Sequence, residues 1–323
     1  MFGFKELKPK ICIAENTVDC PVNDCKEKVD RQRHKFRRDD RFKCPKHGIF
    51  ISPSTFEYED YKNNLLWKAR EDVELLENIF REKRESRIAR DNSEDAVTWN
   101  VFRFLEKNNL IEGLLTNITG ASQTQGQITY WSYSQQQRVG DCRNLLSEAR
   151  AEFGEEEGRG SEPGLIIKTD KTLFFIEAKF ASGNDTPSDK KQIEKKINNP
   201  KNYKTGGDNW FGNVFKSTYK EIISEQKYEL LRFWLLGTWI AQKLGLRFYL
   251  VNLTLADKEK DIEEKFKKHI KEDENKRFLR LTWEGVYEYA STVADSSDKQ
   301  TMLDYLKNKC VYKNRTLQKV FSV

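Results

Sequence analysis

The sequence predicts an α/β protein in which a mixed sheet flanked by helices follows a small N-terminal module rich in cysteine and histidine. Three observations lead to this prediction. Residues 1–58 hold four of the six cysteines and two of the three histidines. Residues 59–92 place apolar side chains at helical spacing, which predicts one long connecting helix. From residue 93 to residue 323, helix patterns and strand patterns alternate, as they do in α/β domains.

The composition is that of a folded protein without a membrane span. Of the 323 residues, 37% are hydrophobic and 33% are charged, which predicts a core beneath a heavily charged surface. The N-terminus lacks the apolar core of a signal peptide. The longest apolar stretch, residues 233–241, is far shorter than the roughly 20 residues that a bilayer requires. We therefore expect a cytoplasmic protein whose cysteines are thiols or metal ligands.

Two pairs of soft ligands in the first module predict a structural metal site. Four residues separate Cys20 from Cys25, and two separate Cys44 from His47. Three thiolates and one imidazole suit a closed tetrahedral Zn²⁺ site. The alternatives are buried free thiols beside a surface histidine, or a site in which Cys12 replaces one ligand. We expect the remaining cysteines to be isolated thiols: Cys142 and Cys310.

The insert between the two ligand pairs, residues 26–43, is strongly basic. A metal-fixed basic loop is suited to contact the phosphates of double-stranded DNA, and arginine can also bind guanine edges. The alternative is a solvated loop whose charge is tempered by Asp30, Asp39 and Asp40. Seven basic residues crowd the insert from residue 31 onward: Arg31, Arg33, Lys35, Arg37, Arg38, Arg41 and Lys43.

The elements of the larger segment follow from periodicity and capping. Ser93 is a candidate N-cap for an amphipathic helix over 94–108. Two apolar strands, 164–169 and 172–180, flank a two-residue turn. We further expect a strand at 128–134, a helix at 142–152, loops and short helices at 183–226, a helix at 228–245, a strand at 247–255, a helix at 257–270, a strand at 278–282 and two closing helices.

The strand at 172–180 carries two charges on an apolar run. Side chains alternate along a strand, so Glu177 and Lys179 share one face. Counting back from the two-residue turn places Gly164 opposite Glu177 and Glu162 opposite Lys179, about 5 Å apart. These four positions therefore converge at one end of the hairpin. Asp170, in the turn, lies roughly 20 Å away at the other end.

Glu177-Ala178-Lys179, preceded by Glu162-Pro163, resembles the motif of the PD-(D/E)xK nuclease superfamily, which includes restriction endonucleases. The resemblance implies that Glu177 and an acid near 162–164 hold Mg²⁺ while Lys179 positions or helps to deprotonate the attacking water. The sequence departs from the motif because Gly164 stands where an aspartate is expected. Either the chain is an inactive form, or Glu162 substitutes from one pleat further along. The alternative without a catalytic role is a Lys–Glu pair at a strand end.

The helix over 94–108 supplies a further candidate site residue, Glu94. The resemblance implies that a glutamate on the helix preceding the sheet can assist the metal. Glu94 shares a stripe with Thr98 and Val101, so it can face the core. The alternative is that Glu94 and Asp95 only oppose the helix macrodipole.

The resemblance implies a Mg²⁺-dependent DNA endonuclease of restriction or phage-defence type, with structural Zn²⁺ in its N-terminal module. Gly164 favours a second hypothesis, a DNA-binding protein that keeps the nuclease scaffold without turnover. A third is a nuclease directed at RNA. Cutting both strands of a duplex calls for two active sites, which a homodimer would supply.

Overall fold

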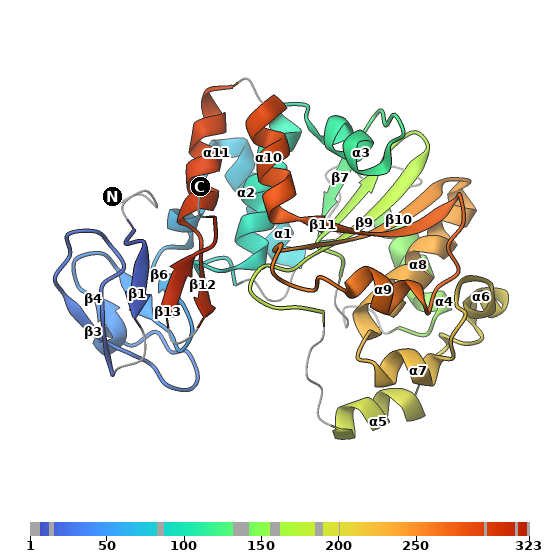
Figure 1. Ribbon diagram of the computed structural model, residues 1–323, viewed down its shortest axis with the longest axis horizontal. Coiled ribbons are helices and arrows are strands. Elements are labelled where there is room, and N and C mark those ends of the chain that lie inside the picture. The colour runs from blue at the N-terminus through green and yellow to red at the C-terminus, as the bar shows by residue number, and fades with distance from the viewer. Residues whose placement is uncertain are drawn as a thin grey trace. The chain divides into compact units, whose positions relative to one another are not determined.

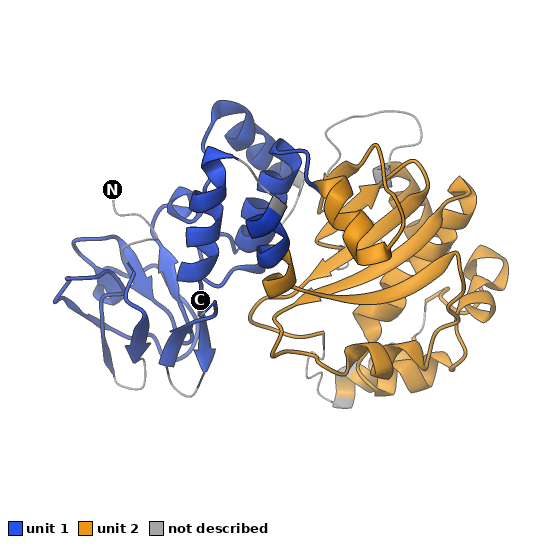
Figure 2. Ribbon diagram, turned by 45° about the horizontal axis from the view of Figure 1, so that its top comes forward, with its two compact units in different colours: residues 1–110, 287–323 blue, residues 111–286 orange. Residues whose placement is uncertain are grey.

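The computed structural model (Figure 1) describes residues 7–12, 16–82, 87–131, 142–155, 162–184, 190–199, 201–293, 296–313 and 316–321. The chain divides into two compact units, coloured separately in Figure 2. The first unit comprises residues 1–110 and 287–323, and the second comprises residues 111–286. This division differs from the three predicted segments, because the C-terminal residues join the N-terminal module in one unit.

The second unit is built around a mixed five-stranded sheet, which confirms the predicted α/β class. Its strands are β7 (Gln127–Tyr130), β8 (Leu165–Lys168), β9 (Thr172–Ala178), β10 (Arg247–Thr254) and β11 (Lys276–Thr282). Their order across the sheet is β11-β10-β9-β8-β7. Strands β7, β8 and β9 are antiparallel neighbours, whereas β9, β10 and β11 run parallel. Strand β9 is therefore central, at the point where the antiparallel part meets the parallel part.

The hairpin of β8 and β9 has the predicted register. Ile167 pairs with Phe174. The Thr169 N–H donates to the Thr172 carbonyl over 2.8 Å, which closes the two-residue turn. Gly164 lies one residue before β8 begins. The hairpin prediction succeeded because a two-residue turn fixes the register by counting, although both faces of β9 are buried.

The helices of the second unit cover the sheet and form the crossover between its parallel strands. They are α3 (Ile111–Thr119), α4 (Cys142–Glu152), α5 (Lys190–Asn198), α6 (Gly206–Val214), α7 (Tyr219–Ser224), α8 (Tyr228–Leu244) and α9 (Ile262–Lys267). Helices α5 to α8 connect β9 to β10, as parallel neighbours require. Helix α8 packs closely on the sheet: a Cβ at Gly237 would lie 2.2 Å from the Phe248 ring. Phe175 lies in the same core as α8, so this face of β9 also carries Glu177 and Lys179.

The first unit combines small sheets with helices. Its elements are β1 (Lys10–Cys12), β2 (Thr17–Asp19), β3 (Lys28–Asp30), η2 (Asp40–Phe42), β4 (Lys43–Cys44), β5 (Ile49–Ile51), β6 (Phe56–Tyr58), η3 (Tyr61–Asn64), α1 (Arg70–Glu82), α2 (Glu94–Lys107), most of α10 (Trp283–Val293), α11 (Ser297–Asn308), β12 (Cys310–Lys313) and β13 (Thr316–Lys319). Helix α2 matches the predicted helix, and the Ser93 hydroxyl accepts from the Ala96 N–H at its start.

The prediction of one long helix over 59–92 is wrong. A short 3₁₀ helix, η3, ends at Asn64, and α1 begins only at Arg70. The Asn64 side chain is 2% exposed and donates to the carbonyls of Ile88 and Arg90, each over 2.7 Å. This buried amide ties the start of the segment to its end, so the chain turns back. Apolar spacing alone does not reveal such a contact.

The prediction that two helices close the chain is also wrong, because α11 is followed by β12 and β13. Strand β13 pairs antiparallel with β1, more than 300 residues away in sequence, and also with β12. Leu317 and Cys310 lie in the core of the N-terminal module. Of the expected strand at 128–134, residues 128–130 lie in β7, Trp131 leaves the extended conformation with a φ of 44°, and residues 132–134 lie outside the described part of the chain. The expected helix at 257–270 is limited to α9.

Candidate functional site

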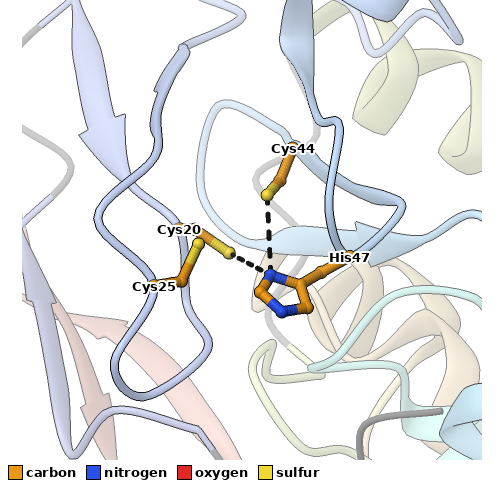
Figure 3. Close-up of side chains that lie close together, drawn as sticks. All are labelled: Cys20, Cys25, Cys44 and His47. Atoms are coloured by element: carbon orange, nitrogen blue, oxygen red, sulfur yellow. Dashed lines mark hydrogen bonds between the residues drawn. The ribbon is translucent and has the colours of Figure 1, made fainter.

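The first unit brings the four predicted metal ligands together. The ligand atoms of Cys20, Cys25, Cys44 and His47 all lie within 4.8 Å of one another. The Nδ1 atom of His47 lies 3.4 Å from the Cys20 Sγ and 3.6 Å from the Cys44 Sγ (Figure 3). The three cysteines are buried, and the histidine is half-buried. This arrangement is a Cys₃His cluster that can hold a metal ion.

The distances in the cluster fit a tetrahedral ion of the size of Zn²⁺. Bond lengths of about 2.3 Å to sulfur and 2.0–2.1 Å to nitrogen place two tetrahedral ligands about 3.6 Å apart. The two distances from His47 Nδ1 match this value. Burial, together with the neighbouring sulfurs of Cys44 and Cys25, raises the pKa of the Cys20 thiol. A thiolate at this buried position therefore requires a compensating cation.

Tight turns aim each ligand pair at the ion. The Cys25 N–H donates to the Val22 carbonyl over 3.3 Å, and the Gly48 N–H donates to the Cys44 carbonyl over 2.9 Å. Gly48 has a φ of 62°, and a Cβ there would lie 2.7 Å from the Glu59 Oε2 atom. The positive φ favours glycine after His47, whereas the Glu59 carboxylate could move away from a Cβ. Sequence reasoning missed this position, although a glycine directly after a ligand pair is a signal for a metal-binding turn.

The other cysteines lie elsewhere. Cys12 is exposed in β1 and is not among the clustered ligand atoms of the described residues. Cys310 is buried, and its Sγ lies 3.5 Å from the Asn308 carbonyl oxygen. Burial raises the pKa of Cys310 to about 12, so it stays a neutral thiol. The side chain of Cys142 lies outside the described part of the chain.

The basic insert lies on the surface of the module and is held at a few points. Arg31 donates to the Pro53 carbonyl over 2.7 Å, and Arg38 donates to the Glu59 carbonyl over 3.0 Å. Arg41 forms an ion pair with Asp39 at 2.7 Å. Lys43 is half-buried and pairs with acidic side chains. The exposed basic side chains of the insert are Lys26, Lys28, Arg33, Lys35, Arg37, Arg38 and Arg41.

In the second unit, β9 carries the predicted carboxylate and ammonium as a close pair. The Nζ atom of Lys179 lies 2.7 Å from a Glu177 carboxylate oxygen, and the side chains are 13% and 7% exposed. The backbone N–H of Lys179 donates to the Leu253 carbonyl, and its carbonyl accepts from the Trp283 indole. Backbone contacts on both sides therefore fix the strand end that presents the pair.

The other predicted hairpin residues lie close by in sequence but have their own contacts. Glu162 forms an ion pair with Arg150 at 3.0 Å. A Cβ at Gly164 would meet the Ile176 carbonyl oxygen at 3.4 Å and the Ala178 Cβ at 3.5 Å, which is ordinary van der Waals contact. A side chain is therefore sterically possible at position 164. Glu94 is half-buried in the first turn of α2, which belongs to the first unit, and its role at a metal stays a prediction.

Two residues that sequence reasoning missed lie beside the pair. The Oε2 atom of Glu229, in the first turn of α8, lies 3.2 Å from Lys179 Nζ. Asn252 of β10 is the Cα partner of Glu177 and is fully buried. An amide within an apolar strand was a usable signal, because a buried polar group must find hydrogen bonds. An acid at a helix start gave no such signal, since it also opposes the macrodipole.

The second unit also contains a buried ion pair, formed by Arg232 and Glu155. Arg232 of α8 donates to Glu155 through Nε at 2.7 Å and Nη2 at 2.5 Å, and Tyr203 donates to the same carboxylate. Burial alone would raise the pKa of Glu155. The hydrogen bonds and charge of Arg232 outweigh burial and lower that pKa below its ordinary value. Arg150 contacts both Glu155 and Glu162, so it links this pair to the hairpin.

The fold and the cluster define a mixed α/β protein with a Cys₃His metal-binding cluster. Comparison with known protein families, with curated proteins and with solved structures gave no match. Within the described residues, no helix has both the length and the hydrophobicity to cross a membrane. The nuclease resemblance therefore depends on the motif and its geometry.

Proposed function

We propose that this chain is a DNA endonuclease of the PD-(D/E)xK type, with a Mg²⁺-dependent centre on the hairpin and a zinc-stabilised module that contacts DNA. The observation that carries the proposal is the pair formed by Glu177 and Lys179 on the central strand. Ligand sites in open α/β sheets form outside the carboxyl ends of parallel strands. The pair lies at the carboxyl end of β9, where the sheet changes from antiparallel to parallel.

The chemistry of the pair suits phosphodiester hydrolysis. Glu177 would supply a carboxylate oxygen to Mg²⁺, a cation that prefers oxygen ligands. The ion would stabilise the charge that develops as the phosphodiester is displaced in line. Lys179 would hold the attacking water by hydrogen bonding and contribute positive charge beside the phosphate. Hydrolysis adds the water oxygen to phosphorus, breaks the bond to a sugar oxygen and leaves that oxygen protonated.

The experiment that tests the proposal compares the native chain with Gly164→Asp on plasmid DNA in the presence of Mg²⁺. The backbone around residue 164 leaves room for a side chain, so the variant is expected to fold. We expect Gly164→Asp to cut, and Gly164→Asp combined with Lys179→Met not to cut. The absence of cutting by every version, on modified and unmodified DNA, would refute the endonuclease.

A second function, DNA binding without turnover, is favoured by Gly164, which offers no carboxylate. It predicts a native chain that binds duplex DNA tightly and never cuts it, while Gly164→Asp restores cleavage. Competition between RNA and duplex DNA in the same binding assay separates the RNA-directed alternative. Sedimentation of the DNA complex tests for the homodimer expected of an enzyme that cuts both strands.

The contribution of the basic insert can be measured separately from cleavage. Lys35 and Arg37 are exposed in the insert, and Lys68 and Arg70 are exposed in the same unit outside it. Replacing the first pair by alanine should lower the slope of log affinity against log salt by about 1.8, since each phosphate contact contributes about 0.9. The second pair is a matched control and should leave the slope unchanged. Equal effects of the two pairs would exclude the insert as the DNA contact.

A further inference from the structure

The geometry points to Glu229 as the second metal-binding carboxylate of the hairpin site, taking the place of the acid missing at position 164. This inference depends on the proposed function. It also names a residue outside the motif, on the helix that covers the sheet. Because Mg²⁺ in proteins is usually held by one or two carboxylates, a second acid near Glu177 is the component that Gly164 removes.

The two contacts of Lys179 set an upper limit on the distance between the carboxylates of Glu177 and Glu229. Its Nζ atom lies 2.7 Å from a Glu177 oxygen and 3.2 Å from a Glu229 oxygen, so these two oxygens lie no farther apart than the sum, 5.9 Å. Two oxygens bound to one Mg²⁺ at about 2.1 Å lie about 3–4 Å apart. Rotation of the partly exposed Glu229 side chain can close this difference without movement of the backbone.

Two other acids near the strand ends are engaged elsewhere: Glu259 accepts from Asn184 and Asn252, and Glu162 pairs with Arg150. The Glu162 carboxylate lies 3.0 Å from Arg150, which also pairs with the buried Glu155. Withdrawing Glu162 would remove one partner from Arg150, whose side chain is 12% exposed. Glu229 pairs with Lys179, which already belongs to the site. Ligation by Glu229 therefore leaves the Arg150 network intact, whereas ligation by Glu162 disturbs it.

An unpaired oxygen beside the strand ends also points to a ligand. The Nδ2 atom of Asn184 donates to Asn252 over 2.6 Å and to the Glu259 carboxylate over 2.9 Å, and Asn252 is the Cα partner of Glu177 in the parallel ladder. Adjacent strands lie about 4.8 Å apart, so Asn252 and Glu177 are immediate neighbours on one face. The Oδ1 atom of Asn184 is buried and has no hydrogen-bond partner among the described residues. A buried acceptor without a donor suits a cation or a water bound to it.

Manganese binding tests the assignment without depending on cleavage. Mn²⁺ would be titrated into zinc-saturated protein and followed by electron paramagnetic resonance, with thermal unfolding of each variant as the check on folding. The variants are Glu229→Gln, Glu177→Gln and Glu162→Gln, each with and without Gly164→Asp. Glu263→Gln, which breaks an exposed ion pair on α9, is the matched control.

We expect Glu229→Gln and Glu177→Gln each to weaken Mn²⁺ binding about tenfold or more, and Glu263→Gln to leave it unchanged. Gly164→Asp should restore binding to Glu229→Gln, because it returns a second carboxylate, and should not restore Glu177→Gln. Loss of Mn²⁺ binding in Glu162→Gln but not in Glu229→Gln would overturn the assignment of Glu229 as a ligand. The proposed metal site on the hairpin would still hold, with Glu162 as its second carboxylate. Failure of both the native chain and Gly164→Asp to bind Mn²⁺ would refute the proposed metal centre itself.

Discussion

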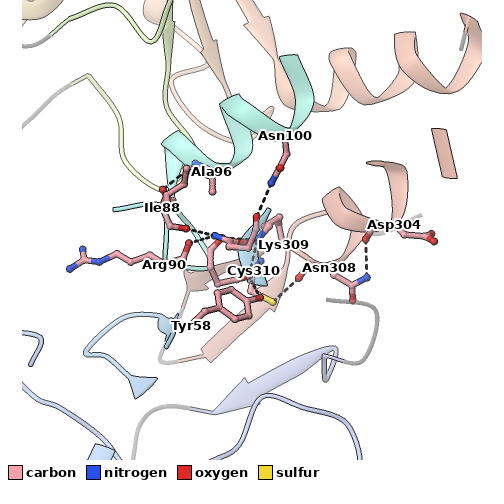
Figure 4. A network of polar contacts seen from close by, with 12 residues as sticks. Tyr58, Ile88, Arg90, Ala96, Asn100, Asp304, Asn308, Lys309 and Cys310 are labelled. Carbon is pink, nitrogen blue, oxygen red and sulfur yellow. Dashed lines mark hydrogen bonds and ion pairs between the residues drawn. The ribbon is translucent and has the colours of Figure 1, made fainter. Parts of the chain in front are cut away.

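Replacing Lys309 by methionine should destabilise the first unit more than any surface change. Lys309 is fully buried, and its Nζ donates to Asn64 Oδ1 at 2.6 Å and to the Asp91 carbonyl and carboxylate at 3.0 Å each. Figure 4 shows the surrounding polar network, which includes Tyr58 and Cys310. Methionine has similar length but offers no donor, so the substitution leaves the Asp91 carboxylate buried without its cation.

The magnitude follows from what remains around Asp91. The Tyr58 hydroxyl and the Cys310 N–H still donate to it, each over a long 3.3 Å. Removing one partner of a buried pair reduces the free energy of unfolding by 3–5 kcal/mol, and we expect about 4 kcal/mol here. For a unit of this size, that corresponds to a fall in Tm of roughly 10–15 °C. Adding Asp91→Asn removes the stranded charge and should recover about 2 kcal/mol.

The assay is thermal unfolding at pH 7.5, with release of zinc to a chromogenic chelator as the reporter of the first unit. Burial lowers the pKa of Lys309, but the Asp91 carboxylate outweighs burial and the net pKa is raised. A raised lysine pKa means that the pair stabilises fully below about pH 10.4 and is lost only above it, so pH 7.5 captures the whole effect. Lys313→Met, an exposed change four residues further along in β12, is the control. Lys309→Met melting within 3 °C of the native protein, or no recovery in the double variant, would refute the reasoning.

Two further predictions concern metal and pH. Elemental analysis should find one zinc ion per chain. Cys44→Ser should lose the zinc and unfold at a lower temperature, whereas Cys12→Ser should keep the zinc. Equal zinc content in both variants would exclude the cluster as the zinc site. The depressed pKa of Glu155 contributes stability that is present above about pH 4.3 and is lost as pH falls through the folded pKa. The free energy of unfolding, measured with urea from pH 7 to pH 3, should therefore fall less steeply for the double variant Glu155→Leu, Arg232→Met than for the native chain. Parallel curves for the two proteins would contradict this.

Local rules account for the parts of the molecule that the sequence predicts well. The register of β8 and β9 follows from a two-residue turn, from which the pairs on both strands can be counted within 20 residues. The Cys₃His cluster follows because each ligand pair closes its own short turn, at Cys20 and Cys25 and again at Cys44 and His47. In the hairpin, the residues that meet are related by a count that the turn fixes. In the cluster, the two pairs meet although Cys20 and His47 lie 27 residues apart, and the shared ligand chemistry of thiolates and imidazole predicts that meeting.

The parts that the sequence did not predict depend on contacts between distant residues. The break in the 59–92 segment is set by Asn64, which bonds to carbonyls 24 and 26 residues later. The C-terminal strands exist because β13 pairs with β1 at the other end of the chain. Glu229 reaches Lys179 across 50 residues, through the packing of α8 on the sheet. No local pattern marks these partners, so composition and periodicity cannot find them.

Three ionisable side chains at one strand end need a physical reason, because a buried ion pair seldom stabilises a fold more than apolar packing would. Lys179 lies between two carboxylates, Glu177 and Glu229. Side-chain exposure rises from 7% at Glu177 to 13% at Lys179 and 26% at Glu229, so the group reaches the surface. The proposed cation site requires this partial exposure, because an ion must reach the two carboxylates from solvent.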